Sequence, residues 1–213
     1  MRYKRPRHYE NRIAKFIDNL YITNPEKFKG NWKDLLKTDK LCLEIGMGKG
    51  SFINKIASLY PKIGFIGMER LDTLILPACE ISESEEITNT RYIAYNAYFL
   101  LDIFSGRELD GIYLNFSDPW LKHRHVKRRL TYPDMLEKYA YVLKKGGFLE
   151  FKTDNDVLFE FSKVSIQNST FKIDEINEDL HKNGENMEIL TEYESKFVNL
   201  GISIKYIRAI NQL

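Results

Sequence analysis

A short segment near the first buried strand, Glu44-Ile45-Gly46-Met47-Gly48-Lys49-Gly50, combines one acid with three glycines at alternate positions. Glycines let a backbone turn tightly and approach a ligand, as they do where a parallel sheet binds a nucleoside cofactor. The spacing G-x-G-x-G departs from the dinucleotide pattern G-x-G-x-x-G, and the acid precedes the first glycine. The segment therefore favours S-adenosylmethionine over NAD.

Two further polar residues stand where a nucleoside cofactor would need them. Glu69 ends the next apolar run about 20 residues later, where an acid accepts hydrogen bonds from ribose hydroxyls; the alternative is a surface glutamate at a strand end. Asn96 follows the third run and can give its amide to adenine or cap the following helix. Both interpretations of Asn96 stay open from sequence.

The segment from Asn115 to Leu130 follows the fourth apolar run and places Asp118 and Trp120 before five basic residues with no acid among them. A charge run is usually a solvated loop. Ligands of open α/β sheets bind at the carboxyl ends of strands, so we expect Asp118 to face the same crevice as Gly48 and Glu69. Phosphate and base binding then explains the basic run, and the RNA-contact candidates are Trp120, Arg124, Lys127, Arg128 and Arg129.

The elements that must position these residues alternate between strand and helix, which predicts an α/β fold. The predicted architecture is Rossmann-like, with a seven-stranded, mostly parallel sheet and helices on both faces. The predicted strands are 41–45, 63–68, 91–95, 111–116, 148–152, 171–176 and 203–210.

Helical periodicity follows the strands. The pattern predicts helices after Gly50, from about Leu71, through Leu101, and from Pro133 to a stop at Gly146-Gly147. Asp154 or Asn155 is expected to cap the next helix, whose core-facing residues are predicted to be Val157, Leu158, Phe161 and Val164.

Composition places the chain among ordinary globular proteins, with 213 residues, 43% hydrophobic and 29% charged. We expect a basic arm and lead-in helix over 1–40 and one domain over 41–213. The arm carries six basic residues in its first 16 against Glu10 alone, and we expect it to hold RNA phosphates.

The remaining features predict a cytoplasmic protein, monomeric or homodimeric, without membrane association. Cys42 and Cys79 lie in apolar patterns and are expected to be buried and inert. No Cys or His pairs stand at metal-ligand spacing, so no metal is expected.

Taken together, these motifs resemble the bacterial tRNA (guanine-N7-)-methyltransferases of the TrmB type. The resemblance spans the chain. Its segments are Glu44 to Gly50, Gly67 to Glu69, Asn96-Ala97, Asn115 to Leu130, Phe151 to Asn155, and Thr191 to Glu194 followed by Phe197 and Gly201. The long basic motif is the most specific of them.

The resemblance implies an enzyme that methylates N7 of the variable-loop guanine at tRNA position 46. The implied cofactor contacts, together with the glycine-rich turn, are Glu44, Gly46, Gly48, Glu69, Asn96 and Asp118, and Asp118 is also the implied catalytic residue. The implied guanosine contacts are Lys122, Asp154, Thr191, Glu192, Tyr193 and Glu194. Ser117 and Leu121 replace prolines that are usual in the family.

Structural alternatives accompany some of these roles. Asp154 fits a helix cap, and Thr191 with Glu194 fits a capping box. The functional alternatives are a small-molecule methyltransferase with the same cofactor and a non-catalytic RNA-binding module on this fold. A nicotinamide-dependent dehydrogenase is the least favoured because of the glycine spacing.

Overall fold

The computed structural model describes residues 5–184 and 189–213, apart from the side chains of Asn183 and Glu192. The chain divides into two units, Met1–Ser105 and Gly106–Leu213. The predicted boundary between an arm and a single domain at residue 40 stays a prediction.

The first unit holds three parallel strands in the order β3-β2-β1. They are β1 (Lys40–Ile45), β2 (Ile63–Glu69) and β3 (Thr90–Ala94). Its α-helices are α1 (Tyr9–Ala14), α2 (Trp32–Leu36), α3 (Ser51–Leu59), α4 (Ile75–Ser84) and α5 (Leu100–Ile103). Short 3₁₀ helices cover Pro25–Phe28, Asp72–Leu74 and Ala97–Phe99. Apolar residues run almost unbroken through β1 and β2 because both faces of these strands are covered.

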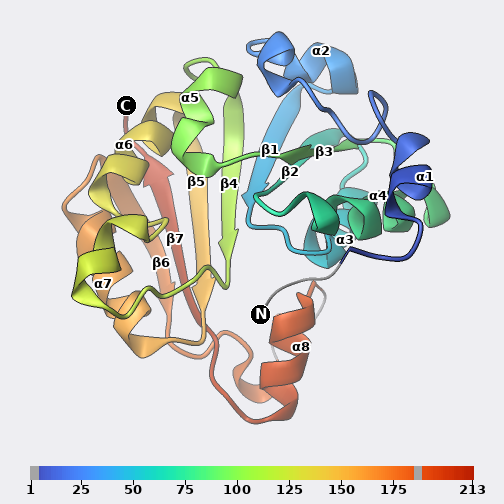
Figure 1. Cartoon of the computed structure of the whole chain (residues 1–213). Coiled ribbons are helices and arrows are strands. Elements are labelled where there is room, and N and C mark those ends of the chain that lie inside the picture. Colours follow the sequence, from blue (N-terminus) through green and yellow to red (C-terminus); the bar gives the residue numbers. More distant parts are fainter. Residues whose placement is uncertain (1–4, 185–188) are drawn as a thin grey trace. The chain divides into compact units, whose positions relative to one another are not determined.

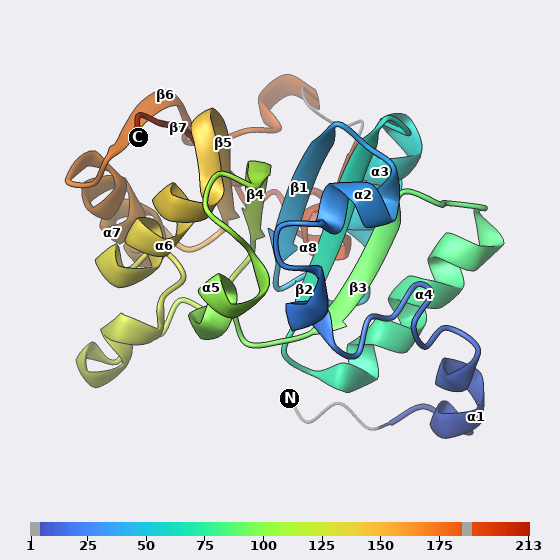
Figure 2. The same cartoon turned by 90° about the horizontal axis from the view of Figure 1, so that it is seen from above.

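The second unit holds four strands in the order β4-β5-β7-β6, with β4 parallel to β5 and β7 antiparallel to both of its neighbours. They are β4 (Leu109–Asn115), β5 (Leu143–Thr153), β6 (Phe171–Asn177) and β7 (Lys205–Asn211). Its helices are α6 (Pro133–Val142), α7 (Asp156–Gln167) and α8 (Glu192–Asn199), with 3₁₀ turns at His123–Arg128 and Lys182–Gly184. Helices α6 and α7 lie side by side in both views (Figures 1 and 2).

These elements confirm the predicted Rossmann-like α/β class, with seven strands in the described residues. One predicted boundary was wrong. Helix α6 ends at Val142, and Gly146 and Gly147 lie inside β5, at an irregularity in its register with β4. Gly146 adopts φ 77°, and a Cβ on Gly147 would lie 2.9 Å from the carbonyl oxygen of Lys144. The glycines therefore permit a bulge rather than end a helix.

The predicted core face of α7 was also wrong for three of its four residues. Val157 and Val164 are 57% and 54% exposed, Phe161 is half-buried, and only Leu158 is fully buried. The buried stripe instead runs through Phe159, Ser162, Ser165 and Ile166. The serines fit it because Ser162 donates to the Leu158 carbonyl and Ser165 to the Thr131 carbonyl. Because serine is polar, the apolar periodicity of the sequence did not reveal this buried stripe.

Other expectations concern thiols, metals and membranes. Cys42 and Cys79 are buried free thiols, and burial raises the pKa of Cys79, as predicted for an inert thiol. The described side chains include no group of three or more His, Cys, Asp or Glu that could hold a metal ion. Within residues 5–184 and 189–213, every helix is too short or too polar to cross a membrane.

Candidate active site

The glycine-rich turn joins β1 to α3 in the first unit. Gly46 and Gly48 adopt φ 80° and 58°, and a Cβ on either would meet nothing within 4 Å. Gly50 differs, because its Cβ would lie 2.5 Å from that of Ala78 on α4. The first two glycines therefore leave open space beside the backbone, and the third lets α3 and α4 pack closely.

Glu69, at the end of β2, is hydrogen-bonded to this turn. Its Oε2 accepts from the Gly48 N–H at 3.2 Å, and its Oε1 accepts from the Arg70 and Leu71 N–H groups at 2.8 and 3.0 Å. The carboxylate is thus fixed by backbone donors and keeps lone pairs for hydroxyl groups. An oriented acceptor beside an open glycine turn fits the ribose of a nucleoside cofactor.

Glu44 precedes the turn on β1, is 2% exposed and is paired in register with Gly67 of β2. Gly67 has no room for a side chain, since its Cβ would lie 2.3 Å from Met47 Sδ and 2.8 Å from the Tyr92 ring. Met47 is the residue between the two open glycines. Met47, which packs beside Gly67, therefore links the turn to the interior of the sheet.

Asn96 caps a 3₁₀ helix, as one of its two interpretations predicted. Its side-chain oxygen accepts from the Tyr98 N–H at 3.1 Å, and the residue is exposed. An amide contact to adenine uses the other end of the same side chain and stays a prediction.

Asn54 supports the glycine-rich turn, a role not predicted from sequence. Its Nδ2 donates to the carbonyls of Gly50 and Ala78 at 2.9 and 3.2 Å, while its Oδ1 accepts from Ser82 and Tyr92 hydroxyls. The residue is fully buried, so it ties the end of the turn to α4 and β3. A polar residue between the core positions Ile53 and Ile56 was the available signal.

The loop after β4, in the second unit, carries Asp118. Phe116 and Trp120 adopt φ 52° and 42°, which is unusual for bulky residues, and Asp118 between them is exposed. The prediction that Asp118 shares a crevice with Gly48 and Glu69 stays a prediction.

The basic residues that follow differ in exposure. Lys122, Arg124, Lys127 and Arg128 are exposed, and the Arg128 guanidinium carbon lies 5.1 Å from the centre of the half-buried Trp120 ring. His125 meets the same ring edge-on, with 5.6 Å between ring centroids. An exposed cation against an indole is a combination that can bind phosphates and bases.

Arg129 is the exception in the basic run, with 4% exposure. Its Nε donates to the Pro119 carbonyl at 2.9 Å, its Nη2 approaches the Trp120 carbonyl at 3.4 Å, and its guanidinium carbon lies 4.5 Å from the centre of the Phe161 ring. A side chain used in this way inside the fold does not reach a phosphate. The structure therefore argues against the predicted RNA contact by Arg129.

Helix α8 lies at the carboxyl ends of β4 and β5 (Figure 1). Its Tyr193 and Phe197 form a triangle of rings with Phe116, with ring centroids 6.1 to 6.2 Å apart. Tyr193 is 58% exposed, whereas Phe116 and Phe197 pack on the buried cluster of Leu180, Ile204 and Tyr206. Tyr193 is thus the ring of this triangle that is accessible to a base.

Glu194, a predicted guanosine contact, is fully buried, and that contact stays a prediction. Its Oε1 accepts from Lys152 Nζ at 2.8 Å and lies 3.2 Å from His181 Nε2, and its Oε2 accepts from the Thr191 N–H at 2.8 Å. Thr191 Oγ1 accepts in turn from the Glu194 N–H, which confirms the predicted capping box. The carboxylate holds the start of α8, and Lys152 and His181 are partners that the sequence analysis missed.

The remaining predicted guanosine residues differ in placement. Thr191 is 7% exposed, Lys122 lies on the surface, and the side chain of Glu192 lies outside the described residues. Asp154 does not cap α7, because Asn155 does so by accepting from the Leu158 N–H at 2.9 Å. The half-buried Asp154 carboxylate therefore stays a candidate for the substrate.

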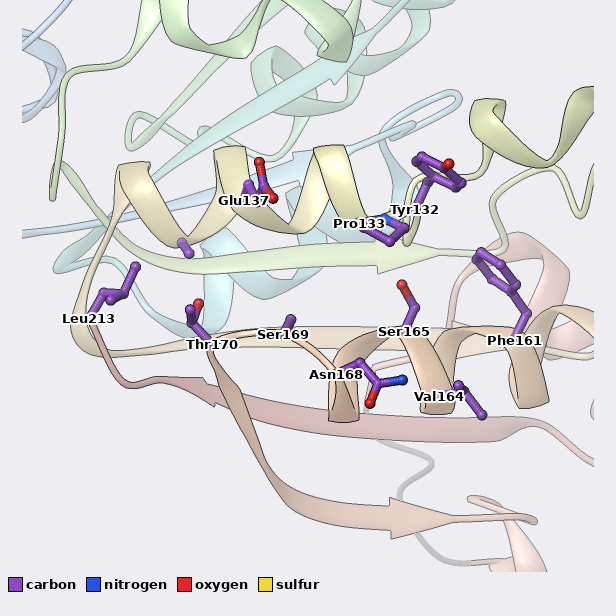
Figure 3. A pocket seen from close by; sticks show the side chains of 11 residues that line it. Tyr132, Pro133, Glu137, Phe161, Val164, Ser165, Asn168, Ser169, Thr170 and Leu213 are labelled. Atoms are coloured by element: carbon purple, nitrogen blue, oxygen red, sulfur yellow. The ribbon is translucent and has the colours of Figure 1, made fainter.

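A pocket of about 580 Å³ opens between α6 and α7 (Figure 3). It is lined by Tyr132, Pro133, Glu137, Ala140, Phe161, Val164, Ser165, Asn168, Ser169, Thr170 and Leu213. None of these is a predicted site residue. Two of its hydroxyl groups, on Ser165 and Ser169, already donate to backbone carbonyls. The pocket therefore does not coincide with the candidate site.

Solved structures share this fold. A 16S rRNA methyltransferase, KamB, superposes with a TM-score of 0.65 at 12% identity, covering 84% of this chain and 92% of that one. An antibiotic-related methyltransferase gives a TM-score of 0.60 at 21% identity over 85% and 94% of the two chains. Similarity at this level supports the fold class.

Sequence relatives are much closer. A family model described as "Putative methyltransferase" matches residues 38–207. A tRNA (guanine-N(7)-)-methyltransferase of Oceanobacillus iheyensis is 43% identical over 86% of this chain and 87% of its own length. One from Halalkalibacterium halodurans is 41% identical over 87% and 85%. One from Listeria monocytogenes is 40% identical over 98% of both chains. This chain therefore belongs to the tRNA (guanine-N(7)-)-methyltransferase family.

Proposed function

We propose that this protein transfers the methyl group of S-adenosylmethionine to N7 of a guanine in tRNA, at position 46 of the variable loop. The observation that carries the proposal is the similarity to the Listeria relative, which spans 98% of both chains and so includes both the glycine-rich turn and the basic loop. We place the reaction in the cytoplasm, where tRNA is found.

The cofactor half of the proposal rests on the first unit. Gly46 and Gly48 offer open backbone, Glu69 offers an oriented carboxylate for ribose hydroxyls, and Asn96 offers an amide for adenine. Glu44 and Asp118 complete the proposed contacts. When bound, S-adenosylmethionine supplies an electrophilic methyl group on a sulfonium.

Guanine N7 carries a lone pair and no proton, so the protein need not supply a strong general base. Positioning of the base is the main task of the residues. The methylated base gains a positive charge, and Asp118 is the proposed catalytic carboxylate that stabilises this charge or holds the N1–H and amino edge. Asp154 is a second carboxylate proposed to contact the guanosine.

The second unit supplies the proposed RNA surface. The exposed cations Lys122, Arg124, Lys127 and Arg128 are proposed to bind phosphates. N7 lies in the deep, narrow major groove of A-form RNA, so the target guanine must be unpaired or opened. The exposed Tyr193 and the half-buried Trp120 are the rings proposed to stack on it, and Thr191 acts through the start of α8.

The test is incubation of the protein with unmodified tRNA and methyl-labelled S-adenosylmethionine, followed by nucleoside digestion and mass analysis. We expect 7-methylguanosine with the wild type and at least a hundredfold less with Asp118→Ala. A guanine 46→adenine tRNA serves as the control for position. Loss of product with this tRNA supports the position, whereas product at another base, or none despite cofactor binding by calorimetry, contradicts the proposal.

A further inference from the structure

The loop that carries Asp118 is held in an unfavourable backbone conformation. Phe116 and Trp120, on either side of Ser117, Asp118 and Pro119, both adopt left-handed φ values of 52° and 42°. Side chains of this size rarely adopt such values unless surrounding groups enforce them. Some group must therefore hold the loop.

At the start of the loop, the Phe116 N–H donates to the Lys152 carbonyl at 3.0 Å, which extends the pairing of β4 with β5. At its end, the carbonyls of Pro119 and Trp120 accept from the Arg129 guanidinium, at 2.9 Å and 3.4 Å. These carbonyls belong to the two residues directly after Asp118. The Phe116 N–H therefore anchors the start of the loop, and Arg129 anchors its end.

An aromatic ring holds Arg129 itself in place. Its guanidinium lies over the ring of Phe161, at 4.5 Å from the centroid, and Phe161 projects from α7 beside the pocket of Figure 3. Among the described residues no carboxylate pairs with it in an ion pair. A buried cation is costly unless its donors are used, and here carbonyl oxygens accept from its Nε and Nη2.

Arg128 shows that the placement of Arg129 is specific. The two arginines are adjacent, but Arg128 is exposed and lies over the Trp120 ring, whereas the buried Arg129 donates to the backbone. Arginine presents several donors in a rigid planar fork, and lysine presents a single ammonium. Lysine at position 129 would keep the charge and lose the simultaneous contacts.

We propose that Arg129 is a positioning residue that holds the Pro119–Trp120 backbone and so sets the orientation of the Asp118 carboxylate. The proposal rests on the proposed function, because it assigns Asp118 to the reacting base. It predicts that Arg129 acts on the chemical step and not on the electrostatic capture of RNA.

The experiment compares Arg129→Lys with Arg128→Lys, a matched change at the exposed neighbour, using kcat and KM for tRNA at two salt concentrations. We expect Arg129→Lys to lower kcat at least tenfold with KM within about twofold of wild type. Arg128→Lys should raise KM with kcat within about twofold. Arg129→Lys with wild-type kcat, or with a changed KM and salt dependence alone, would overturn the proposal.

Trp120 supplies a readout that does not depend on turnover. The chain has two tryptophans, and Trp32 is fully buried, so acrylamide quenching reports mainly Trp120, as Trp120→Phe verifies. We expect Arg129→Lys to increase quenching at unchanged thermal stability. If it does not fold, Phe161→Leu keeps Arg129 but removes the ring beneath it, and should cause a smaller change in the same direction. Unchanged quenching in every folded variant contradicts the proposal, even if the wild type produced no 7-methylguanosine.

Discussion

The chain has two basic segments of similar composition, the N-terminal arm and the loop from Lys122 to Arg129, and the fold uses them differently. In the arm, Arg5 pairs with Glu10 and Asp72, Arg12 contacts both oxygens of Glu80, and Lys15 pairs with Glu83. In the loop, the exposed cations follow one another without an acid between them. Both segments are rich in Lys and Arg, so charge along the sequence does not distinguish their roles.

Apolar burial explains the docking of the arm better than its ion pairs do. The paired side chains are about one-third to three-quarters exposed, so solvent screens these pairs and each contributes little to stability. Tyr9, Ile13 and Phe16 are 6%, 4% and 2% exposed, and burial of each contributes about 1.5–3 kcal/mol. The Tyr9 hydroxyl also donates to the carbonyl of Asp72, three residues after Glu69. These contacts show that the arm packs against the segment after Glu69, whose proposed role is to bind ribose, and RNA binding by the arm stays a prediction. Arg2 and Lys4 lie outside the described residues.

The largest effect expected is from removing residues 1–16. The loss of three buried apolar side chains should lower the free energy of unfolding by several kcal/mol and weaken S-adenosylmethionine binding several-fold. Chemical unfolding and calorimetry measure the two quantities. If cofactor affinity and stability stayed at wild-type values while tRNA binding fell, the arm would be an RNA-binding segment after all.

A comparison of Glu194→Gln with Glu80→Gln tests whether buried and exposed ion pairs differ in their contribution to stability. Breaking the buried contacts to Lys152 and His181 should cost about 3 kcal/mol of unfolding free energy, whereas the exposed Arg12–Glu80 pair should cost less than about 1 kcal/mol. Urea unfolding of both variants checks this. Equal losses would mean that burial does not distinguish the pairs.

Two triple variants with the same loss of charge compare the segments directly. Replacing Lys122, Arg124 and Arg128 by alanine should weaken tRNA binding roughly 50-fold and reduce its salt dependence, because phosphate contacts release counterions. Replacing Arg5, Arg12 and Lys15 should weaken it less than about threefold. Filter binding at two salt concentrations measures both, and similar losses would contradict the division of roles.

The smallest effect concerns pH. Burial raises the pKa of Tyr9 to about 12, above the ordinary value of 10.0. The folded protein then holds this proton where the unfolded chain releases it, so stability present below pH 10 falls as the pH rises toward 12. The fall attributable to Tyr9 is at most about 1.4 kcal/mol per pH unit. Tyr9→Phe should lose less stability than wild type between pH 9 and 11 in urea unfolding; parallel curves would show that Tyr9 titrates normally.

The sequence predicted the strands of the first unit well, because both faces of β1 and β2 are covered and apolar runs report this directly. It predicted the capping box of Thr191 and Glu194 for a similar reason, since a cap depends on neighbours along the chain. Features that depend on neighbouring residues along the chain can therefore be predicted from sequence.

Residues whose role depends on distant partners were not predictable in the same way. Arg128 and Arg129 are identical in type and adjacent, and only the carbonyls of Pro119 and Trp120 separate their roles. The resemblance implied a substrate contact for Glu194, and its bonds to Lys152 and His181 join positions that no sequence pattern connects. Family resemblance identified the positions, and packing determined what each can touch.

Gly67 has a consequence for genetics. A Cβ at this position would lie 2.3 Å from Met47 Sδ, too close for a methyl group, and Met47 lies between the two open glycines of the turn proposed to bind the cofactor. A mutant screen for weakened S-adenosylmethionine affinity should therefore recover alanine at position 67, in the interior of a strand. A second-site change that shortens Met47 should suppress such an allele only in part, because the clash with the Tyr92 ring at 2.8 Å would remain.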